Sequence, residues 1–397
     1  MKAGWTSKPL GELCDVVGGG TPPKDRPGYY GGDIPWATVR DMRTDIITST
    51  EHSITKEAVK ASATNIIPAG NVVIATRVGL GKVCLLGQDT AVNQDLRGIV
   101  PKSSKVIDVN FLFAWFKSIS EQIIAEGTGA TVQGVKLPFI KGLAVPFPEM
   151  EEQRRIVTLL DEAFADIATA KANAEKNLQN ARDFFESHLQ AAFTQQADWE
   201  LKPFGELAEF RNGINFTKSS KGKEIKIVGV RDFQKNFWAP LDDLETIIPD
   251  GEIPATDLIE SGDLLFVRSN GNPELIGRSL LIGELQERIT HSGFTIKARL
   301  RDTQLSPIYL CHYLKSGLLR REMIEGGNGA NIKSLNQGTL SRLKIAFPDK
   351  SKQLLIVEHL ETVQAEIAEL QSIYRQKLTA LDDLKKSLLH QAFSGQL

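Results

Sequence analysis

Two related stretches of the chain begin with Phe147-Pro-Glu-Met-Glu-Glu-Gln153 and Phe347-Pro-Asp-Lys-Ser-Lys-Gln353. They cover residues 148–196 and 348–396, and at an offset of 200 without a gap 15 of their 49 positions are identical. Repetition at a fixed offset indicates a duplicated structural unit. The 397-residue chain is therefore predicted to be one unit written twice.

Each stretch is predicted to form one long helix, because neither contains glycine, or proline after its opening residue, before Phe193 or Phe393. Apolar residues of the second stretch recur at alternating spacings of four and three, which is typical of a coiled coil. The predicted inward-facing positions are Ile356, Leu360, Val363, Ile367, Leu370, Tyr374, Leu381, Leu384 and Leu388, and in the first stretch Ile156, Leu160, Ala163, Ile167, Ala170, Ala174, Asn177, Ala181 and Phe184. Asn177 and Lys377 interrupt the two series at the same place, where buried polar residues help to fix register. The alternative is a pair of ordinary amphipathic core helices.

Each helix follows about 140 residues of mixed character, which open on similar segments at Trp5 and Trp199. Short β-like runs are predicted in both, each followed by an amphipathic helix (residues 109–126 and 307–325). The predicted fold class is α+β, with two tandem mixed domains (residues 1–147 and 197–347) and two long helices (148–196 and 348–397). Two like units related by a pseudo-twofold axis place these helices antiparallel.

The composition is that of an ordinary globular protein, with 41% hydrophobic and 24% charged residues. No apolar run approaches the ~18 residues that a membrane helix needs, and the first residues do not look like a signal peptide. Three scattered cysteines form no paired framework. We expect a cytoplasmic protein without membrane contact.

The net charge of −2 does not by itself indicate nucleic-acid binding. Charge is uneven, however, because residues 211–235 hold seven basic residues against two acidic ones. The basic ones are Arg211, Lys218, Lys221, Lys223, Lys226, Arg231 and Lys235. A local basic surface could hold a phosphate backbone, and a solvated loop is an equally good interpretation.

The usual catalytic motifs are missing from the sequence. The six histidines form no HxxxH pair, no CxxC exists, and no GxSxG occurs. Gly79-Leu-Gly-Lys82 lacks the rest of a phosphate loop and is predicted to be a turn between strands. Neither the glycine-rich loop nor the Asn-Pro-Pro-aromatic motif of a DNA methyltransferase is present. We therefore expect a chain that is not an enzyme.

The architecture resembles the specificity subunit of Type I restriction-modification systems. The resemblance covers the whole chain and rests on the duplicated Phe-Pro-x-x-x-x-Gln helix. Local phrases that resemble those of such subunits are Gly19-Gly-Thr-Pro22, Gly31-Gly-Asp-Ile-Pro-Trp36, Asn93-Gln-Asp95, Val228-Gly-Val-Arg-Asp232, Arg268-Ser-Asn-Gly271 and Ser292-Gly-Phe294.

This resemblance implies a non-catalytic DNA reader with two target-recognition domains, each reading half of a bipartite, asymmetric site in double-stranded DNA. The paired helices would be the spacer and the dock for two methylation subunits. Those partners would bind S-adenosylmethionine, and restriction subunits using ATP and Mg²⁺ would join them. No cofactor and no metal is expected in this chain itself.

Contacts with DNA are expected from loops that differ between the halves, since Arg favours guanine edges, Asn and Gln favour adenine, and Lys meets phosphates. The candidates are Thr38, Arg40, Asp41, Arg77, Asn93, Gln94 and Thr128 in the first domain, and Asn212, Lys221, Arg231, Asp232, Arg268, Asn270, His291 and Asn331 in the second. Three other readings remain open: a coiled-coil scaffold with two protein-binding domains, a DNA-binding regulator that needs no partner, and a fused methyltransferase.

Overall fold

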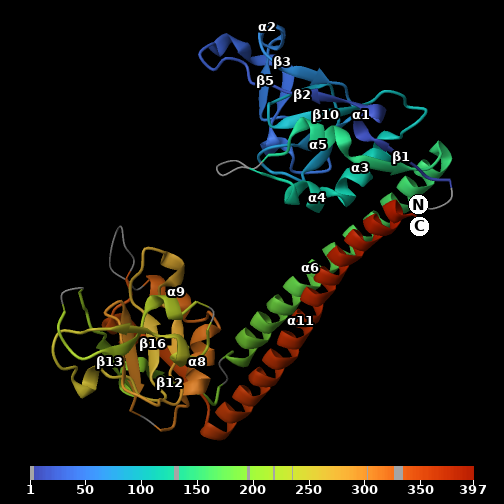
Figure 1. Cartoon of the computed structure of the whole chain (residues 1–397). Coiled ribbons are helices and arrows are strands. Elements are labelled where there is room, and N and C mark those ends of the chain that lie inside the picture. Colours follow the sequence, from blue (N-terminus) through green and yellow to red (C-terminus); the bar gives the residue numbers. More distant parts are fainter. Residues whose placement is uncertain are drawn as a thin grey trace. The chain divides into compact units, whose positions relative to one another are not determined.

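The computed structural model describes residues 4–128, 134–194, 197–217, 220–234, 236–301, 303–325 and 334–397. The chain divides into two compact units (Figure 1). Unit 1 is Met1–Glu175 with Arg375–Leu397, and unit 2 is Lys176–Tyr374. Each unit thus contains one globule together with part of each long helix. Within the described ranges, no helix is long and apolar enough to cross a membrane.

Unit 1 contains two sheets of mixed direction. The first has the order β2 (Cys14–Gly18), β10 (Leu96–Pro101), β7 (Val72–Ala75), β8 (Val83–Leu86) and β4 (Ile46–Ile47). The second has the order β5 (His52–Ile54), β3 (Tyr30–Ala37), β9 (Thr90–Val92) and β6 (Asn65–Ile67). Strands β3 and β9 run parallel, with Trp36 opposite Ala91 and Ala37 opposite Val92.

Unit 2 repeats the main part of this topology, with one strand fewer in each of the two sheets. Its first sheet has the order β13 (Ala208–Asn212), β19 (Thr295–Leu300), β16 (Leu264–Val267) and β17 (Ser279–Leu281). Its second has the order β15 (Glu245–Ile247), β14 (Ile225–Val228) and β18 (Ile289–His291). Again the central pair, β14 and β18, is parallel. The duplication predicted from the helices therefore extends to the sheets, where few residues are shared.

Shorter elements are repeated as well. In each unit the opening strand pairs with the strand before the long helix: β1 (Thr6–Pro9) with β11 (Ala144–Phe147), and β12 (Glu200–Pro203) with β20 (Lys344–Phe347). The short helices of unit 1 are α1 (Leu10–Leu13), α2 (Lys56–Lys60), α3 (Val109–Ser118), α4 (Ser120–Ala125) and α5 (Leu137–Gly142). Those of unit 2 are α7 (Phe204–Leu207), α8 (Pro307–Lys315), α9 (Arg320–Glu325) and α10 (Gln337–Arg342).

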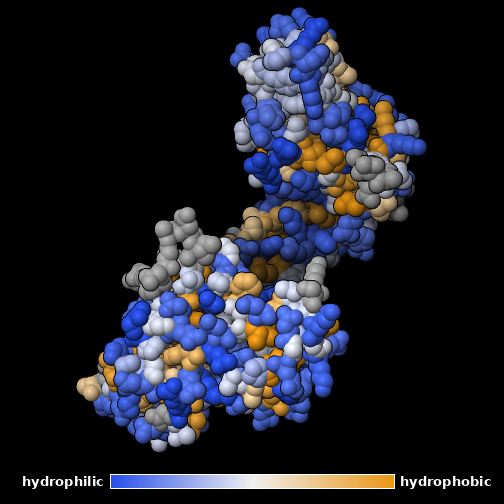
Figure 2. Space-filling model, turned by 90° about the vertical axis from the view of Figure 1, so that its left-hand side faces the viewer, coloured by the Kyte–Doolittle hydropathy of each residue, from blue (hydrophilic) through white to orange (hydrophobic). Residues whose placement is uncertain are grey.

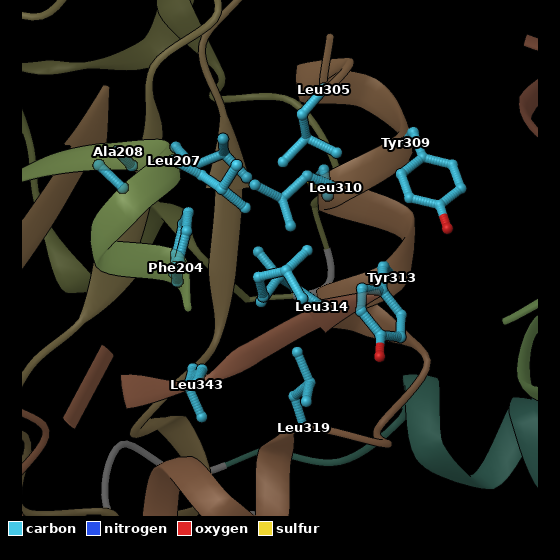
Figure 3. Close-up of a cluster of buried hydrophobic side chains, with 14 of the residues drawn as sticks. Phe204, Leu207, Ala208, Leu305, Tyr309, Leu310, Tyr313, Leu314, Leu319 and Leu343 are labelled. Carbon is cyan, nitrogen blue, oxygen red and sulfur yellow. The ribbon is translucent and has the colours of Figure 1, made fainter. Parts of the chain in front are cut away.

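Side-chain alternation along the central strands builds a core on both faces of each first sheet. In β7, Val72 and Ile74 pack with helix α3, whereas Val73 and Ala75 face the second sheet. In unit 2, Leu264 and Phe266 lie on the helix side in the same way. Figure 3 shows this cluster, with side chains from α7 and α8 converging on it. Tyr309 is fully buried there, and its hydroxyl donates to the Ala346 carbonyl at 3.1 Å, so its polar tip is satisfied.

The amphipathic helix predicted in each globule is divided into two shorter helices. Residues 109–126 form α3 and α4 with a break at Ile119, and residues 307–325 form α8 and α9 with a break that contains Gly317. Gly317 has φ +80°, which glycine adopts without steric cost. Gly79 and Gly81 also have positive φ, and the turn predicted between β7 and β8 is confirmed there.

The long helices α6 (Met150–Ala192) and α11 (Lys350–Ser394) pair antiparallel within each unit. In unit 1 the start of α6 packs against the end of α11, through Ile156, Leu160, Leu389 and Ala392. In unit 2 the partners are Leu189 and Phe193 of α6 with Val357 and Leu360 of α11, and Ala181 with Val363 and Ile367.

Most of the predicted seam is confirmed along the full length of the helices, since Ile167, Ala174 and Ala181 are buried and Tyr374, Leu381 and Leu388 are half-buried. Four of its positions are wrong. Leu370, Leu384 and Phe184 are exposed by 40%, 46% and 53%, and Lys377 is also exposed. Their neighbours Phe185, Leu378 and Lys385 lie at the half-buried positions instead. An α-helix has 3.6 residues per turn, so a strict 3.5-residue repeat drifts by about 20° in each heptad. This drift accounts for a shift of one residue in the row that contains Leu370 and Leu384, whereas the row of Leu360, Ile367, Tyr374, Leu381 and Leu388 keeps its predicted place.

Candidate nucleic-acid interface

Polar loops gather at the carboxyl ends of the central parallel strands, in the same backbone frame in both units. The loop after β9 is tied to β3 by the Asn93 amide, which donates to the Ala37 carbonyl at 3.0 Å. In unit 2 the Ser292 amide donates to the Val228 carbonyl, also at 3.0 Å. The loops after β7 and β16 join the same cluster, where the Thr76 and Arg268 amides donate to Asp95 and Phe294, both at 2.8 Å.

A glycine lets the loop after the first sheet strand cross this cluster closely. A Cβ on Gly19 would lie 2.1 Å from the Asn93 carbonyl oxygen, and one on Gly213 would lie 2.2 Å from that of His291. The next amides, of Gly20 and Ile214, donate to Val92 and His291 at 3.0 and 2.9 Å.

A Val-Arg-Asp turn follows the central strand in each unit, at Val39–Asp41 and Val230–Asp232. The Asp41 carboxylate accepts from the Thr38 amide, and the Asp232 carboxylate accepts from the Gly229 amide, both at 2.7 Å. The carboxylates therefore close their own turns. The arginine between them, Arg40 or Arg231, is left on the outer side of the turn.

In unit 1 the remaining candidates form one connected patch. Arg77 lies 3.6 Å from Asp95 and stays half exposed, while Asn93 donates to the same carboxylate at 3.1 Å. Gln94 is exposed and accepts a hydrogen bond from the Thr21 hydroxyl. Thr128 is exposed on a bridge whose other strand ends at Gly134, beside the Arg77 side chain.

In unit 2 the loop after β16 carries Arg268, whose guanidinium donates to the Gly293 carbonyl at 3.4 Å. Asn270 is half buried, and its side-chain oxygen accepts from the Asn272 amide at 2.8 Å. Asn212 and Lys221 are exposed at the end of β13 and in the following loop. Asn331 lies outside the described residues.

Several predicted contacts are not surface side chains. His291 is 0% exposed, and its Nδ1 lies 2.9 Å from the Thr295 hydroxyl. Its Nε2 has no hydrogen-bond partner among the described atoms, and burial lowers the pKa of His291 to about 3. Asp232 and Asn93 are also buried, and their side chains make hydrogen bonds within their own loops. We therefore remove these three side chains from the candidate contacts, and treat Thr38 and Asp41 as turn-closing residues.

The basic stretch of residues 211–235 resolves into pairs and free lysines. Arg211 pairs with Asp257, Lys226 with Glu287 at 2.7 Å, and Arg231 with Asp232 at 3.3 Å. Lys221 and Lys223 are exposed and make no ion pair with any described residue. Lys218 and Lys235 lie outside the described residues. The stretch is therefore only partly a basic surface.

The three cysteines are buried in the cores of the two units. Cys14, Cys84 and Cys311 are buried, and burial raises the pKa of these thiols to about 12, 11 and 12, so that none is a ready thiolate. Among the residues that the structure describes, no group of three or more His, Cys, Asp or Glu side chains could hold a metal ion. Each unit has its own set of loops with hydrogen-bonding tips, which we call its candidate interface. Such loops suit recognition.

Comparison with known proteins agrees with this architecture. The family model described as Type I restriction modification DNA specificity domain matches residues 2–178 and 196–379. The MjaIX specificity subunit of Methanocaldococcus jannaschii is 24% identical over 99% of this chain and 93% of its own length. The EcoR124I/EcoR124II specificity subunit of Escherichia coli is 34% identical over 39% of this chain and 40% of its own.

Two solved structures share the fold. A chain from work on complex assembly and conformational transition of the type I R-M system has a TM-score of 0.79 and 18% identity, and covers 100% of this chain and 99% of that one. The HsdS subunit from Thermoanaerobacter tengcongensis has a TM-score of 0.64 and 19% identity, covering 100% and 98%. With the family model matched in both halves, the chain belongs to the Type I restriction modification DNA specificity family.

Proposed function

We propose that the chain is the DNA-reading subunit of a Type I restriction-modification complex, in which each unit reads one half of a bipartite, asymmetric site. The observation that carries this proposal is the duplicated candidate interface. The same hydrogen bonds hold the loops in both units, yet the side chains that they present differ. One scaffold with two sets of loop tips suits two different half-sites.

The proposed readers are the candidates whose side chains reach the surface. In unit 1 they are Arg40, Arg77, Gln94 and Thr128, and in unit 2 they are Asn212, Lys221, Arg231, Arg268 and Asn270. Arginine forms bidentate hydrogen bonds with guanine, and asparagine and glutamine do so with adenine, whereas lysine contacts phosphate. The nearly neutral net charge of −2 supports a division of affinity between this chain and its partners.

We also propose that the long helices set the gap between the half-sites and dock two methylation subunits. Large apolar side chains remain exposed on these helices, which supports a partner-binding role. They are Leu159 and Leu384 in unit 1, and Phe184, Leu354, Leu355, Leu370 and Ile373 in unit 2. Adenine methylation with S-adenosylmethionine, and restriction with ATP and Mg²⁺, belong to the partners in this proposal.

The experiment is to co-express the chain with its methylation subunit in a methylation-free host and to map modified adenines across the genome. We expect one two-part motif with a fixed gap, which disappears when this chain is omitted. A stable complex without new methylation would favour a scaffold. Tight, selective DNA binding by the chain alone would favour a regulator, and methyl transfer by the chain alone a fused methyltransferase.

A point substitution tests the assignment of the halves to the units. Arg268→Ala removes the guanidinium beside Gly293 and should relax the second half-site while the first stays readable. Arg301→Ala is the matched control, because Arg301 is an exposed arginine at the opposite end of β19 from the recognition loops. Equal loss of both half-sites would point to misfolding instead.

A further inference from the structure

Equivalent positions in the two units carry side chains of opposite character. The amides of Thr76 and Arg268 donate to the carbonyls of Asp95 and Phe294, so that Asp95 and Phe294 occupy the same place in the repeated frame. The Asp95 side chain is 16% exposed and is held by Arg77 and Asn93. Phe294 is 59% exposed. An inward-tied carboxylate in unit 1 is therefore replaced by an outward phenyl ring in unit 2.

The backbone under this phenyl ring is fixed on three sides. The Phe294 amide donates to the Ser292 hydroxyl at 3.3 Å, its carbonyl accepts from Arg268 at 2.8 Å, and the Gly293 amide donates to the Ile214 carbonyl at 2.7 Å. The loop that begins at Ile214 exposes a second ring, Phe216, by 39%. Because the loops are already held by these hydrogen bonds, an exposed ring on them can meet an apolar group of a partner without the cost of ordering the loop on binding.

We propose that Phe294 reads a thymine in the second half-site through the thymine 5-methyl group, which projects into the major groove. This proposal rests on the proposed function. A phenyl ring cannot hydrogen-bond to a base edge or neutralise a phosphate, and the thymine methyl is the apolar group that the major groove displays. Arg268, whose backbone holds Phe294, is a polar reader suited to the same groove.

The exposed Phe294 ring is a local apolar feature of a mainly hydrophilic surface (Figure 2). Figure 2 shows mainly hydrophilic side chains, with hydrophobic ones in scattered patches. An exposed ring on the candidate interface is a directed contact within a polar surface. In unit 1 the neighbours of Asp95 on these loops, Thr21 and Gln94, are hydrogen-bonding groups, so we expect the two half-sites to be read by different chemistry.

The test begins with the methylation map of the wild-type complex, which decides the proposed function by itself. If a bipartite motif is found, we expect Phe294→Ala to accept bases other than thymine at one position of the second half-site. Phe294→Leu keeps an apolar tip and should retain thymine there. Leu201→Ala, on an exposed leucine of β12, should leave the motif unchanged.

Binding to defined duplexes then isolates the methyl group. Replacing that thymine by deoxyuridine removes only the methyl, and should weaken binding of the wild-type complex by about fourfold. The Phe294→Ala complex should bind both duplexes equally. Equal binding of the wild-type complex to the thymine and deoxyuridine duplexes would overturn the proposal. If Phe294→Ala then lowered binding to all sequences, the ring would act as a wedge between base pairs instead. An unchanged motif in Phe294→Ala would overturn the proposal as well.

Discussion

Gly19 and Gly213 hold the candidate interface together in their units, because a carbonyl oxygen lies where any other residue would place its Cβ. We expect Gly19→Ala to displace the loop after β9 and to cost about 1–3 kcal/mol, as overpacking usually does. Recognition of the first half-site should weaken, while the second is kept. Gly213→Ala should have the converse effect.

Methylation mapping with urea unfolding checks this, and the chain offers a matched control. A Cβ on Gly28 would meet nothing within 4 Å, so alanine at this position should leave both half-sites intact. Loss of both half-sites in Gly19→Ala would contradict the independence of the two interfaces.

Two buried histidines make unit 2 sensitive to acid. Burial lowers the pKa of His291 to about 3 and that of His312 to about 4, from 6.5. The unfolded chain takes up these protons below pH 6.5 and the folded chain does so only near its own lower pKa values. The free energy of unfolding should therefore fall as the pH drops from 6.5 towards 4, by on the order of 2 kcal/mol for each histidine at pH 5.

Urea unfolding at pH 7.5 and pH 5 measures this loss. His312→Gln cannot take up the proton and should show a smaller loss than the wild-type chain. His390→Gln is the control on an exposed histidine. Equal pH dependence in wild type and His312→Gln would contradict a lowered pKa of His312 in the folded chain.

The burial of His291 could not be predicted from the sequence around it. The segment Ile289-Thr-His-Ser292 has polar residues that are typical of a loop or an edge strand. In the fold Ile289–His291 is indeed an edge strand, β18, paired with β14, but it is covered by a neighbouring segment, whose Ile259 amide donates to the Ile289 carbonyl at 3.0 Å. Burial here depends on neighbours that are far away along the chain, so residue type alone misplaced the side chain.

At the scale of elements, Gln153 and Gln353 are the residues of the Phe-Pro-x-x-x-x-Gln motif whose role the structure explains. Both are 0% exposed. Gln153 accepts from the Asp108 amide at 2.8 Å and donates to the carbonyls of Val106 and Pro148 at 3.0 and 2.9 Å. Gln353 makes the same three kinds of bond in unit 2. Each glutamine therefore ties the start of a long helix to its globule.

Gln153→Leu should leave the buried Pro148 carbonyl unpaired, at about 1–3 kcal/mol, and the half-buried groups of Asp108 and Val106 unpaired at a smaller cost each. We expect a loss of about 2–3 kcal/mol in the free energy of unfolding, measured in urea. Gln179→Leu makes the same change at an exposed position of the same helix and should cost little. Similar losses in the two variants would contradict the role of Gln153 as a tie.

The helices also show how far a periodic pattern reaches. Leu360, Val363 and Ile367 were predicted to face inward and are buried. Leu370 and Leu384 were predicted on the same repeat and are exposed, because the pattern was read at 3.5 residues per turn along a helix that turns every 3.6. The existence and the pairing of the helices and most of their inward-facing positions were predictable, whereas the one-residue shift of the row that contains Leu370 and Leu384 was not.

At the scale of the whole chain, the repeat made the fold class predictable and left the interfaces largely open. The identical positions in the long helices identified the duplication, although the strands of the globules share few residues. What those globules have in common is backbone geometry, such as the turns closed by Asp41 and Asp232. The exposed tips diverge, so the outward ring of Phe294 had no sequence counterpart in unit 1 to point to it.

The length of the helices provides the last prediction. Under the proposed function they set the gap, so removing one heptad from each should shorten the recognised spacing. Suitable heptads are Ala172–Leu178 and Gln371–Lys377, which lie between the Lys171–Asp382 ion pair of 2.7 Å and the contact of Ala181 with Ile367. Seven residues at 1.5 Å each remove about 10 Å, or about three base pairs at 3.4 Å.

Seven residues are close to two helical turns, so the seam is rotated by only about 20° and the pairing should survive. The methylated motif should keep both half-sites and lose about three base pairs from its gap. Deleting Ala172–Leu178 alone is the control, since it shortens one helix against the other and should abolish methylation. A doubly shortened chain that still methylates with the original gap would show that the helices do not set the spacing.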